Sequence, residues 1–187
     1  HKLVAEQEQD CAAPTAHIKA NDALVGTFEA EVPMAEPANI TMAHLYTLMQ
    51  VNVKNGTGAD IVVTKFEMTA ADADLAGVFN VESFETPSIS TKSGASSTIT
   101  VNVANGAVKA GELLPVYFIM APLSNYSGDV TFKVMDASGR LVAPLRIPLG
   151  LLEASWKNKT LGVDFVQFRE YFLTRISETK NSRKQQL

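Results

Sequence analysis

The stretch that decides the fold is LYTLMQVNVKNGTGADIVVTKFEM, residues 45–68. Its first part alternates between two faces. One face carries Leu45, Thr47, Met49, Val51 and Val53. The other carries His44, Tyr46, Leu48, Gln50, Asn52 and Lys54. A period of two is typical of a strand with one face on the core and the other toward water. Asn55-Gly56 follows, and because these residues tolerate positive φ, they predict a tight turn into the next strand.

The same alternation recurs along the chain, with turn residues between the runs. It is regular in residues 98–103 and 130–135, and weaker strands are expected at 24–32, 61–68, 78–82, 114–120 and 141–147. Asn105-Gly106 and the loop at 136–139 supply further turns. Short strands at this spacing, without helices between them, favour a sandwich over a βαβ sheet. The sequence therefore predicts a mainly-β sandwich of seven or eight strands.

The C-terminal part breaks this pattern. Phe165, Phe168, Phe172 and Ile176 fall at helical spacing and predict an amphipathic helix over about 163–180. Such a helix could cap an open end of the sandwich or dock on a partner, and both readings stay open. The expected organisation is a flexible leader over residues 1–20, a β-sandwich domain over 21–160, and a C-terminal helix with a polar tail over 161–187.

Composition excludes several classes of protein. A chain of 187 residues with 46% hydrophobic residues can bury a sizeable core, and no run approaches the roughly 20 apolar residues of a membrane-spanning helix. Cys11 is the single cysteine, so no internal disulfide is expected, and its acidic surroundings do not fit a lipidation motif. Residues 1–20 show no signal-peptide pattern, so an exported protein would be seen here in a mature or trimmed form.

The charge is unevenly distributed along the chain. Residues 1–139 hold 16 acids, 7 lysines and no arginine, whereas residues 140–187 hold 5 arginines, 4 lysines and 4 acids. The balances of −9 and +5 give the net charge of −4. Because the basic residues are diluted by Phe and Glu and the rest of the chain would repel phosphate, no nucleic-acid partner is expected.

A search for catalytic or metal-binding patterns finds none. His1, His17 and His44 have no ligand spacing, and neither a G-x-S-x-G elbow nor a phosphate-binding loop occurs. Asp72 and Asp74, with Asp60 and Glu67 nearby in sequence, could contribute to a calcium site. They lack the ligand number and the glycine of a calcium loop, so a solvated loop is favoured. We therefore expect no catalytic residue, no cofactor site and no metal site, and we do not expect an enzyme.

Two segments carry a resemblance to a known family. The first is AHLYTLMQVNVKNGTGADIVVTKFEMTAADADLAGVFNV, which ends in an L-x-G-x-F-x-V element at Leu75, Gly77, Phe79 and Val81. The second is PVYFIMAPLSNYSGDVTFKVMDASGR, with Ala121-Pro122 and a turn from Asp136 to Gly139. Over roughly residues 20–160, this pattern of strands and turns resembles the fimbrillin-type pilus and surface subunits of Bacteroidales bacteria.

The resemblance implies a structural or accessory subunit of a surface fimbria that contributes to adhesion. It implies a Greek-key, transthyretin-like sandwich, export as a lipoprotein precursor and a location on the outer membrane. The implied partners are other fimbrial subunits, joined by strand exchange after a cut at a basic residue, and host or bacterial surface ligands. Since no arginine precedes residue 140, the cut would lie upstream of His1 or at Lys19, unless the chain is not processed in this way.

A second hypothesis assumes the same β-sandwich fold but a ligand-binding function. Tyr46, Tyr117 and Tyr126 could stack on sugars if their rings faced outward, which would make the chain a carbohydrate- or protein-binding surface module.

Overall fold

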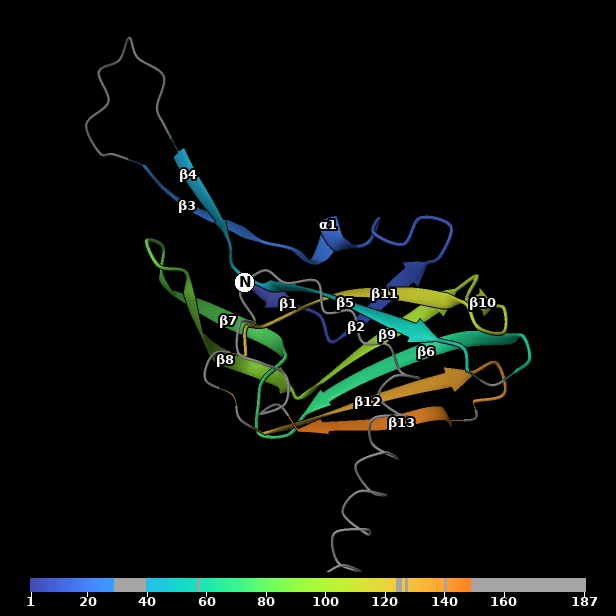
Figure 1. Cartoon of the computed structure of the whole chain (residues 1–187). Helices are drawn as coiled ribbons and strands as arrows, with labels where there is room; N and C mark the ends of the chain where they lie inside the picture. Colours follow the sequence, from blue (N-terminus) through green and yellow to red (C-terminus); the bar gives the residue numbers. More distant parts are fainter. Residues whose placement is uncertain (29–39, 57, 124–125, 127, 140, 149–187) are drawn as a thin grey trace, which may run out of the picture.

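The computed structural model describes residues 1–28, 40–56, 58–123, 126, 128–139 and 141–148, and it is a β-sandwich (Figure 1). Its one helix in this part is α1 (Ile18–Asn21). The strands are β1 (Lys2–Leu3), β2 (Glu6–Asp10), β3 (Leu24–Phe28), β4 (Ile40–His44), β5 (Thr47–Lys54), β6 (Ile61–Ala70), β7 (Ala76–Ser83), β8 (Ser88–Ser96), β9 (Thr98–Ala104), β10 (Ala107–Val108), β11 (Leu113–Met120), β12 (Asp129–Asp136) and β13 (Leu141–Pro148).

The largest sheet has the order β13-β12-β6-β9-β2, with β10 paired to β6. The pairings within it are antiparallel except at its edge, where β2 runs parallel to β9. The antiparallel pair β5–β11 lies across this sheet and forms the facing layer (Figure 1). A third sheet, β1-β7-β8, adjoins β11 where the N–H of Ala121 donates to the carbonyl of Leu75 at 2.8 Å.

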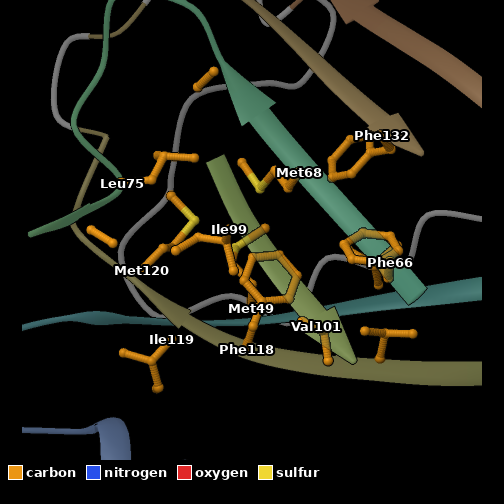
Figure 2. Close-up of a cluster of buried hydrophobic side chains, with 14 of the residues drawn as sticks. Met49, Phe66, Met68, Leu75, Ile99, Val101, Phe118, Ile119, Met120 and Phe132 are labelled. Carbon is orange, nitrogen blue, oxygen red and sulfur yellow. The ribbon is translucent and has the colours of Figure 1, made fainter. Parts of the chain in front are cut away.

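The core lies between the two layers and is aromatic at its centre. Phe66 of β6 is fully buried, and its ring centroid lies 5.6 Å from that of Phe118 on β11 and 5.8 Å from that of Phe132 on β12. Figure 2 shows these side chains with Met49 and Ile99 in one cluster. Because the cluster joins β5, β6, β9, β11 and β12, burial of its apolar surface is what holds the layers together.

The predicted alternation is confirmed on the central strands. The buried residues are Met49, Val51 and Val53 on β5, Ile99, Val101 and Val103 on β9, and Val130, Phe132 and Val134 on β12. Asn105 adopts φ of 57°, as its predicted turn requires. Asn55, expected to do the same, is not among the positive-φ residues of the described part. It is buried, and its amide donates to the carbonyls of Ala59 and Val108 at 2.8 and 2.9 Å.

Tyr46 is the clearest error on the predicted strand faces. We expected it on the outward face, but it is only 4% exposed. The extended run is interrupted here: β4 ends at His44 and β5 begins at Thr47. Because Leu45 and Tyr46 lie in the bend between these strands, strict alternation does not apply, and both side chains enter the core.

The number of strands also differs from the prediction. The described residues form thirteen strands, and β1, β2, β4, β8 and β10 were not expected. β8 (SISTKSGAS) is mostly exposed and has little apolar alternation, so its sequence reads as a loop. Residues 1–20, expected to be a flexible leader, contribute β1 and β2 to two sheets and bury Leu3 in the core. The predicted C-terminal helix and the tail at 161–187 lie outside the described residues.

The β3–β4 pair extends away from the sandwich (Figure 1). On one of its faces the apolar side chains of Leu24, Ile40 and Met42 are more than half exposed. Gly26 lies opposite Met42, and a side chain there would collide with the Met42 sulfur and the Thr41 carbonyl. The hairpin is held at its base, where Asp22 contacts the His44 imidazole at 2.7 Å.

Candidate functional site

The N-terminal segment forms a parallel strand pair, whereas the other pairs among the described strands are antiparallel. β2 lies along the edge of β9 in parallel, in a register that matches Glu6 with Thr100 and Asp10 with Ala104. Two backbone hydrogen bonds close the ends of the ladder: Thr100 N–H donates to Ala5 at 2.8 Å, and Cys11 N–H donates to Ala104 at 3.1 Å. The edge of the large sheet is therefore covered by a five-residue polar strand.

β2 has buried side chains although all of its residues are polar or charged. Its sequence, EQEQD, contains no apolar residue, yet every second side chain is buried. Gln7 and Gln9 are 2% and 1% exposed, whereas Glu6, Glu8 and Asp10 face solvent. Buried amides need hydrogen-bond partners, because an unpaired polar group in an apolar interior costs free energy.

Those partners are backbone groups of β11 in the opposite layer. The Gln7 amide donates to the carbonyl of Ile119 at 2.7 Å and accepts from its N–H at 3.0 Å. The Gln9 amide donates to the carbonyl of Pro115 at 2.8 Å and accepts from the N–H of Tyr117 at 2.7 Å. Each side-chain amide thus makes the two hydrogen bonds that a neighbouring strand would make, and β2 joins β9 by its backbone and β11 by its side chains.

His17, just before α1, completes the cover of β11. Its Nε2 lies 2.9 Å from the carbonyl of Tyr117, which can only accept, so Nε2 is the protonated nitrogen. Together with Gln7 and Gln9, this imidazole hydrogen-bonds to backbone N–H and carbonyl groups of Pro115, Tyr117 and Ile119. These groups lie on the side of β11 away from β5. Figure 2 shows Ile119 and Phe118 on different sides of β11, as alternation along a strand requires.

The turn that follows β2 is fixed by Asp10. Its carboxylate accepts from the backbone N–H of Ala12 at 2.9 Å and from the Asn105 amide at 2.8 Å. These two hydrogen bonds, of which that from Asn105 has the larger effect, lower the pKa of the Asp10 carboxyl.

Cys11 is half-buried next to the end of β9, and desolvation raises the pKa of its thiol. Cys11 packs against the core as a half-buried side chain.

The residues singled out from the sequence do not come together as one site. His1 Nδ1 lies 2.9 Å from the Tyr46 hydroxyl, His17 serves β11, and His44 is exposed beside Asp22. Asp72 and Asp74 are exposed in the turn before β7. In the described part of the chain, no group of three or more His, Cys, Asp or Glu side chains is placed to hold a metal ion.

The tyrosines expected to form a sugar-stacking surface are spread over the molecule. Tyr46 is buried against Phe79, and desolvation raises its pKa to about 12. Tyr126 is half-buried, and its hydroxyl donates to the carbonyls of Ala71 and Asp129. Tyr117 is half-buried on β11. Because Tyr46 lies in the core and the Tyr126 hydroxyl is bound to backbone carbonyls, these two rings do not join Tyr117 in an outward aromatic platform.

Sequence reasoning missed Gln7 and Gln9. The signal was present as a strict alternation of acid and amide over residues 6–10, preceded by the apolar run Leu3, Val4 and Ala5 and followed by Cys11. An uncharged amide at every second position of a short strand marks the face that can be buried if backbone groups are available to pair with it.

Comparison with protein-family models gives a match over most of the chain. A family model described as fimbrillin-like matches residues 4–160, which is most of the chain and includes β2 and the described strands that follow it. No curated protein matches the sequence. Among the described residues, no helix is long and apolar enough to cross a membrane.

Proposed function

The chain belongs to the fimbrillin-like family, and we propose that it is a structural or accessory subunit of a bacterial surface fimbria, joined to its neighbours by strand exchange at the place now held by β2. Other fimbrial subunits are its partners in this proposal, and the cell surface, with anchoring at the outer membrane through a lipidated precursor, is its location. The observation that carries it is the double pairing of β2, by backbone to β9 and by side chains to β11.

Loss of β2 would open a groove with two hydrogen-bonding walls. One wall would be the edge of β9, and the other the uncovered groups of Pro115, Tyr117 and Ile119 on β11. Exposed strand edges are templates for another chain, because an added strand pairs their N–H and C=O groups. A strand from a neighbouring subunit would therefore restore the same contacts between molecules.

The segment around β2 is suited to release. Ala12, Ala13, Thr15 and Ala16 are exposed in the connection between β2 and α1, and Lys19 is exposed on α1. A cut after Lys19 would detach Gln7, Gln9 and His17 in one piece, so the three side chains that hydrogen-bond to the β11 edge would leave together. Lys19 is accordingly the processing site we favour within this chain.

The test is controlled removal of the segment. A cleavage sequence for a sequence-specific protease is placed after Lys19, the protein is cut, and the product is followed by size-exclusion chromatography and electron microscopy. We expect the cut protein to lose residues 1–19 slowly and to form oligomers or filaments as it does so.

The control carries the same cleavage sequence after Glu85, in the exposed turn between β7 and β8, where a cut removes no strand. This protein should stay monomeric after cutting. A protein cut after Lys19 that releases residues 1–19 and remains monomeric would count against strand exchange.

A further inference from the structure

The groove that β2 occupies is lined by β9 on one side and β11 on the other, and the two strands bind β2 differently. This difference limits which strand could replace β2. β9 offers backbone groups to the backbone of the incoming strand, as any sheet edge does. β11 is not a sheet partner of β2, and its hydrogen bonds with β2 are made by the side chains of Gln7 and Gln9. The chemistry of the incoming side chains therefore decides whether the β11 edge is paired.

Each of the two side chains must donate and accept at once. Gln7 pairs with the N–H and the carbonyl of Ile119, and Gln9 with the N–H of Tyr117 and the carbonyl of Pro115. A primary amide carries a donor and an acceptor in one plane, whereas a carboxylate only accepts, an ammonium only donates, and an aliphatic side chain does neither. Asparagine has the right groups on a stem one methylene shorter.

Burial strengthens this requirement. Gln7 and Gln9 are among the most buried side chains of the molecule, so a charged replacement would be desolvated without a counter-charge. An apolar replacement would leave four backbone groups of β11 without partners, and each buried unpaired group costs about 1–3 kcal/mol. Glutamine is thus the side chain that fits both positions.

Building on the proposed function, we propose that this groove selects its partner strand by a Gln-x-Gln pattern. The occupant is an extended strand of a neighbouring subunit with glutamine at two positions separated by one residue. Its outward positions are less constrained, because Glu8 faces solvent and Glu6 accepts only one exposed hydrogen bond, from the Asn102 amide at 3.2 Å. Within this chain Gln7 and Gln9 are the one pair of glutamines at that spacing, so a second copy would have to donate β2 itself.

The experiment uses the full chain with the cleavage sequence after Lys19, cut but not separated from its segment. Fluorescent peptides that span residues 1–12 compete for the groove, and binding is followed by anisotropy. One peptide has the native sequence and one carries Gln7→Met and Gln9→Met. A matched control carries Glu6→Met and Glu8→Met, which place the same side chains on the outward face and remove only the exposed hydrogen bond that Glu6 accepts from the Asn102 amide.

We expect the native and control peptides to bind with affinities within about threefold of each other. The peptide without the glutamines should bind at least about 100-fold more weakly, since a tenfold change corresponds to 1.4 kcal/mol. In ¹⁵N-labelled cut protein, the amide resonances of Tyr117 and Ile119 should return to the positions they have before the cut when the native or the control peptide is added. The peptide without the glutamines should not restore them.

The outcomes separate the two proposals. If all three peptides bind alike, the amide selection is overturned and strand exchange stands. If no peptide enters while the released segment leaves the protein, the groove does not accept a strand from another molecule, and both proposals are overturned.

Discussion

The side-chain amide of Gln7 makes both hydrogen bonds of a strand neighbour with Ile119, a residue 112 positions further along the chain. The contact joins the edge strand of one sheet to a strand of the facing layer, and it does so without an ion pair or an apolar side chain. It makes the N-terminal segment part of the sandwich, although this segment is polar.

Replacing Gln7 should therefore destabilise the fold. Gln7→Met keeps a similar side-chain length but leaves the N–H and the carbonyl of Ile119 buried without partners. We expect a loss of about 2–4 kcal/mol in the free energy of unfolding, measured by urea denaturation. Glu8→Met, on the exposed face of the same strand, should change it by less than about 0.5 kcal/mol. Equal losses at the two positions would show that the amide is not the cause.

The buried side chain of Asn55 should stabilise the loop after β5, because it hydrogen-bonds to backbone carbonyls in that loop and on β10. Its amide donates to the carbonyls of Ala59 and Val108, and its own backbone pairs with Gly111 and Glu112. Asn55→Ala leaves the buried Val108 carbonyl without the amide and should cost about 2 kcal/mol in urea denaturation. The exposed Asn80 provides the control, because Asn80→Ala removes no buried contact. An unchanged midpoint for Asn55→Ala would contradict this role.

Gly106 should not tolerate a side chain. It follows Asn105 in the turn after β9, and a Cβ there would overlap the carbonyl oxygen of Val63 and crowd Val103. Since the overlapped atom is backbone, Gly106→Ala should cost about 3 kcal/mol or more of unfolding free energy.

Gly94 supplies the comparison for Gly106. It has φ of 62° with open space around it, so Gly94→Ala should cost about 1 kcal/mol from the left-handed conformation alone. Thermal denaturation of the two variants would rank them, and a larger loss at Gly94 would be inconsistent with the packing around Gly106.

Tyr46 makes stability depend on pH in the alkaline range. Burial raises the pKa of its hydroxyl from 10 to about 12, so the folded protein keeps a proton that the unfolded chain releases. This contribution is complete below pH 10 and is lost as the pH rises through 12. The free energy of unfolding should therefore fall between pH 10 and 12, and tyrosinate absorbance should report a late-titrating residue.

The variant Tyr46→Phe isolates this effect. It removes the contact of the hydroxyl with His1 Nδ1 and also removes the titrating group. Below pH 10 it should be the less stable protein, and between pH 10 and 12 its stability should fall less steeply than that of the wild type. Parallel curves over that range would exclude Tyr46 as the source.

The central strands could be predicted because their faces differ in polarity. Val101 and Phe132 lie in runs where apolar and polar residues alternate, and the apolar ones are buried in the structure. β2 could not be predicted in this way, because Gln7 and Gln9 are polar and their burial depends on partners on β11. Tyr46 was misplaced because a bend between β4 and β5 breaks the period of two.

The sequence by itself determined the class of fold. Alternation and turn residues such as Asn105 act over a few neighbouring positions, so they specify strands and turns without knowledge of the rest of the chain. Tertiary structure alone decided that a polar N-terminal segment becomes an edge strand, that its glutamines are buried, and that β11 is covered by side chains. Those outcomes depend on the placement of backbone donors and acceptors more than 100 residues away, and no local pattern encodes that placement.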